Sequence, residues 1–220
     1  MTQKNPDILV FPRKFVEGYD RFVAWNEASS FMPGLDRSKA WLTRDKAESS
    51  RDWVQPIPCA LIRNHSHRYC VLRRIRQTRA DLRARISLIV GGHVERDSGD
   101  ETVSALLTNT LRRELDEELG VRGVSVIKPV GLVVDAVSLL ASRHVGFVYE
   151  TVISRRLAAH APEEFSSRSK FTGHFFSPAE LFRFQSEFDP WSLILFEDYI
   201  AASIAVKTAR QIKFPFLANE

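Results

Sequence analysis

Residues 113–121, with the sequence RELDEELGV, decide how the rest of this chain is interpreted. On a helical wheel of about 100° per residue, Glu117 and Glu118 lie within about 60° of Glu114, so the three carboxylates share one face. Leucines recur at every fourth residue beside that face: Leu111, Leu115 and Leu119. The pattern predicts a helix that packs its leucines on a core and places its carboxylates at the edge of that contact.

A cation is expected beside these carboxylates. Like charges three and four residues apart repel, at a cost of roughly a few tenths of a kcal/mol per pair in an isolated helix. Arg113 lies four residues before Glu117, and Arg112 four before Asp116, so ion pairs could neutralise the cluster. A hard divalent cation such as Mg²⁺, which prefers carboxylate and phosphate oxygens, would suit it equally well. The spacing alone leaves both interpretations open.

The same stretch resembles the helical half of the Nudix box, R-E-U-x-E-E-x-G-U, in which U is an apolar residue. It matches that pattern at every specified position. With ordinary composition, such a match should arise by chance in a chain of this length only about once in ten thousand. Upstream, residues 91–95, GGHVE, are similar to the glycine-led loop of the family, where glycine lets the backbone approach a ligand closely.

The upstream spacing departs from the family pattern. Nudix boxes normally have fourteen steps from glycine to arginine, whereas Gly92 and Arg113 are twenty-one apart, so seven residues are extra. Gly99 has the family spacing but follows a polar loop instead of a strand. The glutamate expected eight places before Arg113 is Ala105, and Glu101 is the nearest substitute. The longer loop and the N-terminal extension are similar to the isopentenyl diphosphate isomerase branch.

The resemblance implies a fold and an activity. The fold is a Nudix-type α/β/α sandwich with a mixed sheet and closing C-terminal helices. Residues 1–50 would be an N-terminal extension packed on the domain, and residues 51–220 the Nudix domain. The activity is cleavage of a diphosphate bond in a nucleoside diphosphate linked to another moiety. The implied cofactor is Mg²⁺ or Mn²⁺, which would neutralise phosphate charge and lower the pKa of a bound water.

Carried over residue by residue, the resemblance also implies a site. Glu114, Glu117 and Glu118 would bind the metal and act in catalysis. Gly91 would add a backbone carbonyl to the metal site, and Arg113 would orient a carboxylate.

Three further candidates each have a structural alternative. Glu164, or its neighbour Glu163, is the candidate general base on a later loop, although an acidic residue there also suits the start of a helix. His93 could contact a phosphate or make a structural hydrogen bond in its turn. Arg85 ends a run of six arginines over residues 73–85, which could form a lip over an anionic substrate or a solvated loop.

The remaining pattern predicts a mixed α and β order. Strands are expected over residues 57–62, 69–72, 86–90, 121–136 and 144–153, and helices over residues 36–49, 102–119, 177–188 and 191–210. The polar residues 63–68 indicate a hairpin turn, and Pro58 would confine its strand to a sheet edge or a strand start. Asp100 is a candidate N-cap of the carboxylate helix, which Gly120 should end.

Composition restricts the setting. With 44% hydrophobic and 26% charged residues, the 220-residue chain matches a globular domain. Its apolar runs are far shorter than the roughly 20 residues that cross a bilayer. Residues 1–14 lack the apolar core of a secretory signal, so a cytoplasmic location is expected. Cys59 and Cys70 lack zinc-site partners and are predicted to be buried thiols.

The formal charge of +4 favours anionic partners. Without a recognisable nucleic-acid module, we expect a small-molecule diphosphate and no nucleic acid.

Three functions compete on the sequence. The first is an active diphosphate hydrolase, which the presence of all three carboxylates favours. The second is a Nudix-fold sensor that binds a nucleotide or diphosphate without cleaving it, which the altered loop spacing favours. The third is diphosphate isomerisation, which uses a cysteine near the glycine loop in the related branch, whereas Cys59 and Cys70 lie well upstream. The substrate and the oligomeric state are left open, with a homodimer among the alternatives.

Overall fold

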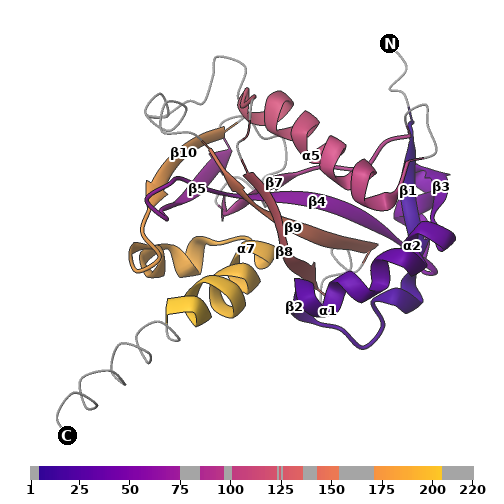
Figure 1. The fold of residues 1–220 in the computed structure, drawn as a ribbon, viewed down its shortest axis with the longest axis horizontal. Coiled ribbons are helices and arrows are strands. Elements are labelled where there is room, and N and C mark those ends of the chain that lie inside the picture. The colour runs from indigo at the N-terminus through magenta and orange to yellow at the C-terminus, as the bar shows by residue number, and fades with distance from the viewer. Residues whose placement is uncertain are drawn as a thin grey trace, which may run out of the picture.

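The computed structural model describes residues 5–74, 85–96, 101–122, 124, 126–135, 143–153 and 171–204. In this part of the chain, a mixed β-sheet lies between helices that cover its two faces (Figure 1). One long helix covers the first face, and helices near the C-terminus cover the second. The predicted α/β/α sandwich with a mixed sheet is therefore confirmed.

The main path of the sheet passes through β10 (Phe171–Phe176), β5 (Tyr69–Arg74), β4 (Trp53–Arg63), β9 (His144–Val152), β8 (Val126–Val134) and β2 (Arg21–Ala24). Beside this path pair β1 (Asp7–Pro12), β3 (Ala40–Thr43), β6 (Ile86–Ser87) and β7 (Ile89–Gly91). Strands β4 and β9 are parallel, whereas β8 and β9 are antiparallel. The sheet is therefore mixed, with its parallel pair at the centre.

The helices fall into three groups along the chain. Before β4 come η1 (Arg13–Phe15), α1 (Trp25–Ala28), η2 (Ser29–Phe31), α2 (Met32–Ser38) and α3 (Arg44–Ser49). Helix α5 (Val103–Leu119) follows the glycine loop. The last group contains η4 (Glu180–Glu187), α7 (Pro190–Leu195) and the π-helical turn η5 (Phe196–Ala201). The predicted helix over residues 102–119 is confirmed to within one residue.

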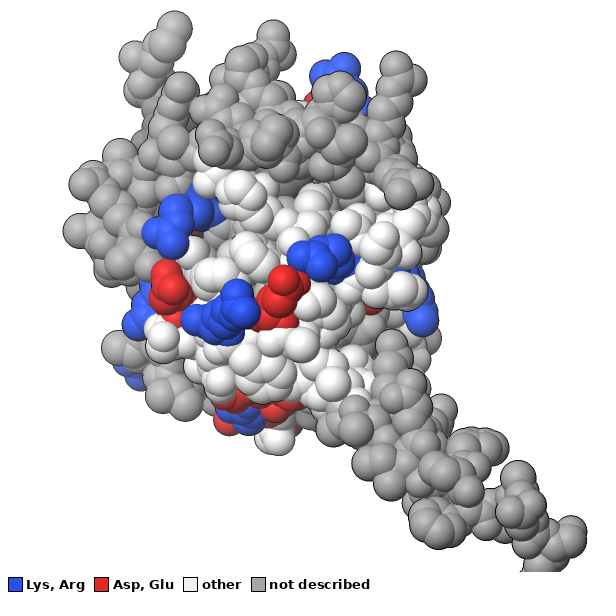
Figure 2. Space-filling model, turned by 90° about the vertical axis from the view of Figure 1, so that its left-hand side faces the viewer, with Lys and Arg blue, Asp and Glu red and all other residues white. Residues whose placement is uncertain are grey.

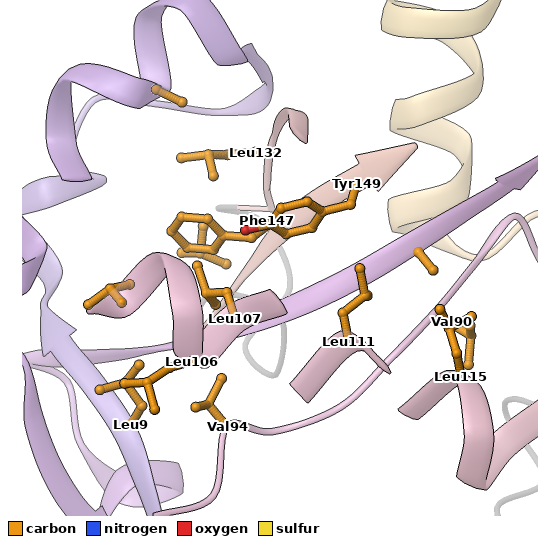
Figure 3. Close-up of a cluster of buried hydrophobic side chains, with 14 of the residues drawn as sticks. Leu9, Val90, Val94, Leu106, Leu107, Leu111, Leu115, Leu132, Phe147 and Tyr149 are labelled. Carbon is orange, nitrogen blue, oxygen red and sulfur yellow. The ribbon is translucent and has the colours of Figure 1, made fainter. Parts of the chain in front are cut away.

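Helix α5 packs on the sheet with the leucines that its sequence pattern predicts (Figure 3). Its fully buried leucines are Leu107, Leu111, Leu115 and Leu119. From the sheet side they join Val90, Phe147 and Tyr149 in one cluster. Burying each leucine stabilises the fold by roughly 1.5–3 kcal/mol relative to leaving it in water. This anchoring fixes the direction of the carboxylates on the adjacent helix face.

The second face of the sheet holds a separate core. Because alternate residues of a strand point to opposite faces, Ala60 and Ile62 of β4 contribute to the α5 side while Cys59 and Leu61 face α7 and η5. Cys59 and Cys70 are both buried free thiols, as predicted. Burial raises the pKa of each thiol above its ordinary value.

Both ends of α5 carry capping interactions. The N-cap is Thr102, whose hydroxyl oxygen accepts a hydrogen bond from the Ala105 backbone N–H at 3.3 Å. The candidate N-cap Asp100 lies outside the described residues, and since Thr102 occupies the cap position that assignment is wrong. Gly120 ends the helix as predicted, with a left-handed φ of 68° that glycine adopts without steric cost.

The N-terminal segment is hydrogen-bonded into the sheet. Strand β2 pairs with β8, and β1 pairs with both β3 and β4. The helix predicted over residues 36–49 is wrong in its middle, where β3 separates α2 from α3. Strand β3 forms because β1 offers it a partner, which local sequence does not reveal. The division at residue 50 stays a prediction.

Strand β4 is longer and more central than its prolines predict. The expectation that Pro58 confines its strand to an edge is wrong, because β4 lies between β5 and β9. On the side away from β9, β1 pairs with β4 up to Val54 and β7 pairs from Cys59 onward. Between these positions the described strands give β4 no partner on that side. A proline at position 58 therefore removes no ladder hydrogen bond there.

The C-terminal elements agree with the prediction in part. Within residues 177–188, expected to be α-helical, Glu180–Glu187 form the 3₁₀ helix η4. The helix expected from residue 191 begins at Pro190 and is described as far as residue 204. Strand β10 has no counterpart in the prediction, because its sequence FTGHFF lacks a clear alternation. It forms against the edge of β5, with which it pairs along its whole length.

Figure 2 shows the side of the molecule that lies at the left of Figure 1. On this face, basic and acidic side chains lie next to each other on a largely uncharged surface. Ion pairs of this kind join Arg68 to Glu180 at 2.9 Å and Arg73 to Glu187 at 3.4 Å. The described part of this face therefore carries no extended basic patch. Among the described residues, no helix is long and apolar enough to span a membrane.

Candidate active site

The site begins where the glycine loop meets helix α5. Gly92 follows β7 and lies directly against the carboxylate of Glu114, which is buried with 7% of its surface exposed. A β-carbon at position 92 would lie 2.6 Å from Glu114 Oε2 and closer still to the rest of the carboxylate. Gly91 is equally confined, because a β-carbon there would collide with the backbone of Pro58. The two glycines are therefore required for space: Gly91 lets the loop lie against β4, and Gly92 lets it approach α5.

Arg113 connects the loop to two of the three carboxylates. Its Nη2 atom lies 2.9 Å from Glu114 Oε1 and donates a hydrogen bond to the His93 carbonyl oxygen at 3.0 Å. Its Nη1 atom donates to Glu117 Oε2 at 2.9 Å. The planar guanidinium suits this arrangement, since its N–H groups diverge in a fixed fork. The ion pair predicted between Arg113 and Glu117 is confirmed.

The three carboxylates differ in exposure. Glu114 is buried, while the Glu117 side chain is 54% exposed. Glu118 lies between these extremes, with its Oε2 atom buried. Asp116, on the neighbouring helix face, accepts a hydrogen bond from Arg122 at 2.7 Å. The cluster thus runs from the core edge into solvent, as the leucine ridge predicts.

The donor set is compatible with a magnesium or manganese ion. All three side chains offer hard oxygen donors, and the glycine loop lies against one of them, Glu114. Among the described residues, no group of three or more His, Cys, Asp or Glu side chains is already arranged as a complete metal site. Mg²⁺ does not require one, because proteins commonly hold it by one or two carboxylates together with substrate phosphates and water.

His93 lies in a cluster that also includes residues distant in sequence. Its ring centroid is 5.4 Å from that of His144, at the start of β9. Burial, assisted by the positive charge of Arg44, lowers the pKa of His93 to about 4, so its ring is neutral near pH 7. On helix α3, Arg44 donates to Glu48 at 2.8 Å and holds the pKa of Glu48 below its ordinary value.

Sequence reasoning missed Arg44, Glu48 and His144 as neighbours of the glycine loop. The four-residue spacing of Arg44 and Glu48 indicates an ion pair on a helix. Nothing in that spacing places the helix beside His93, because β1 and β3 bring it there.

The longer box loop is held at both ends by the N-terminal segment. At its beginning, the Leu9 N–H donates to the Val94 carbonyl at 2.8 Å. At its end, the Asp36 carboxylate accepts from the Val103 N–H at 2.6 Å, and Lys39 Nζ donates to the Glu101 carbonyl at 2.6 Å. The loop is therefore fixed to β1 and α2 on either side of residues 97–100, which lie outside the described residues.

The structure does not bring every predicted residue to the cluster. The side chain of Glu101, which precedes α5, accepts a hydrogen bond from Asn109 at 3.0 Å, and Asn109 lies five residues or roughly 7.5 Å along the helix before Glu114. Arg85 donates to the carbonyls of Ser186 and Phe188, both at 3.3 Å, on the α7 side. A substrate contact by Arg85 stays a prediction. Glu163, Glu164 and three of the six arginines in the run, at positions 76, 79 and 83, lie outside the described residues.

Comparisons with known proteins identify the fold. No family model matches this sequence, and no curated protein matches it. Among solved structures, Tm1382, provisionally assigned as a Nudix hydrolase, matches with a TM-score of 0.68 at 22% identity, covering 92% of this chain and 99% of that chain. DR0079 from Deinococcus radiodurans is 22% identical with a TM-score of 0.47, covering 71% of this chain and 89% of its own. A Nudix hydrolase from Nitrosomonas europaea is 17% identical with a TM-score of 0.45, covering 68% and 90%.

The likeness to Tm1382 shows that this chain has the Nudix fold, which residues 113–121 predict. Because the match covers 92% of this chain, it includes most of the N-terminal segment. The finer resemblance to the isopentenyl diphosphate isomerase branch stays a prediction.

Proposed function

We propose that this protein is a metal-dependent hydrolase that cleaves the diphosphate bond of a nucleoside diphosphate linked to another moiety. The observation that carries the proposal is the buried Glu114 carboxylate, held between Gly92 and Arg113 at the end of the glycine loop. A buried ion pair contributes little to stability, and apolar residues of similar volume often replace one without loss. Because burying the Glu114 carboxylate gains little stability, its position beside the glycine loop points to a chemical role.

In this proposal Glu114, Glu117, Glu118 and the Gly91 carbonyl hold Mg²⁺ or Mn²⁺. The bound ion would neutralise phosphate charge and make a water molecule a better nucleophile. The carboxylates suit this role because they share one helix face and differ in exposure, so a ligand can reach the exposed Glu117 from the solvent side. The donor chemistry favours neither ion over the other.

The protein's own groups have separate roles in the proposed reaction. Arg113 is a positioning residue, because it holds the Glu114 and Glu117 carboxylates and the His93 carbonyl in one fork. One of the three carboxylates is also proposed to receive a proton from the attacking water. Glu164, or its neighbour Glu163, on a later loop is the other candidate for that proton transfer. A phosphate contact by His93 is also proposed, since its neutral ring lies at the same loop.

A binding protein without catalysis is the second candidate. Two observations favour it: Arg113 already neutralises Glu114 and Glu117, and Ala105 stands where the family has a glutamate. A sensor would bind diphosphate compounds through the same loop and leave them intact.

Cleavage of a panel of compounds, measured by chromatography of the nucleotide products, separates the two functions. The wild type is assayed with Mg²⁺ against nucleoside triphosphates, dinucleoside polyphosphates, ADP-ribose, NADH and coenzyme A. A hydrolase cleaves at least one of them, and Glu118→Gln abolishes that cleavage while the thermal unfolding curve is retained. Asp116→Asn is the matched control, because Asp116 pairs with Arg122 on the same helix and should leave turnover near the wild-type value.

Two results would decide against the hydrolase. Unchanged turnover in Glu118→Gln would remove the assignment of that carboxylate. No cleavage of any compound, together with a thermal shift on binding, would establish the sensor instead.

A further inference from the structure

The short helix α3 presents an arginine, Arg44, beside the glycine loop. Its Nε atom donates to Glu48 Oε1 at 2.8 Å, one turn further along the helix. The two side chains are 47% and 45% exposed, and an ion pair at this exposure contributes little to stability. The Nη1 and Nη2 groups of Arg44 form no hydrogen bond within the described part of the chain. The pair with Glu48 therefore leaves most of the guanidinium fork available to an anion.

Backbone contacts with one strand fix α3 near the loop. Strand β1 is hydrogen-bonded to the loop, because the Arg96 N–H donates to the Asp7 carbonyl at 2.9 Å. Next to Asp7, the Pro6 carbonyl accepts a hydrogen bond from the Arg44 N–H at 3.1 Å. Further along α3, Ala47 is buried in a cluster with two side chains of β1. The same strand therefore holds both the helix and the loop.

The electrostatics of His93 indicate that Arg44 faces the loop. Burial lowers the pKa of His93 most, and the positive charge of Arg44 and, more weakly, that of Arg113 lower it further. From the other side, the pKa of Glu48 is lowered mainly by its hydrogen bond with Arg44, with contributions from His93 and His144. The His93 ring therefore lies within electrostatic reach of one guanidinium from α5 and one from α3.

The proposed reaction requires a further positive charge. Arg113 and one divalent ion would balance the three carboxylates, so the negative charge of a substrate diphosphate would be left uncompensated. Arg113 cannot supply more, because its guanidinium already contacts two carboxylates and the His93 carbonyl. A guanidinium with unused N–H groups suits this task, since its fork matches two oxygens of one phosphate. Of the two arginines near His93, Arg44 is the one that has such groups.

We propose that Arg44 binds a phosphate of the substrate through its Nη1 and Nη2 groups while Glu48 holds its Nε atom. The inference rests on the proposed function, which places a diphosphate at the carboxylate cluster. It gives the N-terminal segment a direct part in substrate binding, because α3 belongs to that segment. The Nudix box includes no residue of this segment, so its motif does not reveal Arg44.

Binding of imidodiphosphate, a diphosphate whose P–N–P bridge resists hydrolysis, tests the assignment. The probe is titrated by calorimetry with Mg²⁺ at pH 8, where His93 is neutral with or without Arg44. The proteins are the wild type, Arg44→Gln, and Arg44→Lys, which keeps the charge and loses the fork. Lys46→Gln is the matched control, because it removes the same charge from an exposed position roughly 200° around the same helix. Thermal unfolding curves check that each variant is folded.

We expect the Kd of imidodiphosphate to rise about 30-fold in Arg44→Gln and about tenfold in Arg44→Lys, with less than a twofold change in Lys46→Gln. An unchanged Kd in Arg44→Gln, or equal weakening in Lys46→Gln, would overturn the phosphate contact. Wild-type affinity in Arg44→Lys would overturn the role of the fork.

Failure of the proposed function has a different signature. In that case the wild type cleaves no diphosphate compound, while the binding of imidodiphosphate still depends on Arg44. If instead the wild type cleaves a compound and Arg44→Gln has the same KM for it, only the role of Arg44 is refuted.

Discussion

Replacing Gly92 with alanine tests whether the position of the Glu114 carboxylate controls activity. The new methyl group would lie 2.6 Å from Glu114 Oε2, whereas ordinary contact begins at 3.4 Å. The carboxylate must therefore move by roughly 1 Å, and a displacement of that size in a catalytic group can reduce the rate by about 100-fold. Because the obstructing atoms are the end of a flexible side chain, the helix can stay in place. Overpacking of this kind costs about 1–3 kcal/mol.

The assay compares kcat/KM for a cleaved diphosphate with the free energy of unfolding in urea. We expect Gly92→Ala to lose about 100-fold in kcat/KM and no more than about 3 kcal/mol in stability. Gly34→Ala is the control, because its β-carbon would lie 2.8 Å from the Phe15 ring, away from the carboxylates. That variant should lose stability and retain its rate. Full activity in Gly92→Ala, or the same loss of rate in Gly34→Ala, would refute the reasoning.

Three further predictions concern the supports of the site. In a urea titration, Arg113→Ala should destabilise the protein by about 3 kcal/mol, because it leaves the Glu114 carboxylate buried without its guanidinium partner. The control is Arg112→Ala, at an exposed neighbouring position, which should change the stability by less than about 0.5 kcal/mol. Thr102→Ala should cost about 1 kcal/mol through loss of the N-cap of α5, and an unchanged unfolding midpoint would contradict the capping role. Cys59 and Cys70 should resist iodoacetamide at pH 8 in the folded protein, because burial raises the pKa of both thiols and keeps them protonated. Mass spectrometry after treatment with iodoacetamide should show both cysteines alkylated only in the unfolded protein.

Part of the fold could be predicted because its signal is local. The leucines of α5 recur with the period of a helix, and Gly120 follows the last of them, so the helix and its end were readable without any contact. Strand β9 was likewise predicted to within one residue. By contrast, β3 and β10 form only because β1 and β5 offer them partners, so their sequences carried no sufficient signal. The central position of β4 also depends on its neighbours. Its prolines are tolerated because the described strands leave residues 55–58 without a partner on one side.

The candidate site, like the fold, combines features that the local sequence predicts with features that depend on tertiary contacts. The spacing of Glu114, Glu117 and Glu118 placed the three carboxylates on one face, and the structure adds their graded exposure. The approach of His144 and of helix α3 to the glycine loop depends on contacts between segments far apart in the chain.

The sequence by itself determined a helix with three carboxylates along the edge of its leucine ridge, since helical periodicity is a property of neighbouring residues. Only the tertiary structure decided which carboxylate is buried and which residues meet the glycine loop. It also decided that the N-terminal segment joins the sheet, through β1 against β4 and β2 against β8. Burial and strand pairing depend on where the fold brings distant segments together, and no local pattern encodes that position.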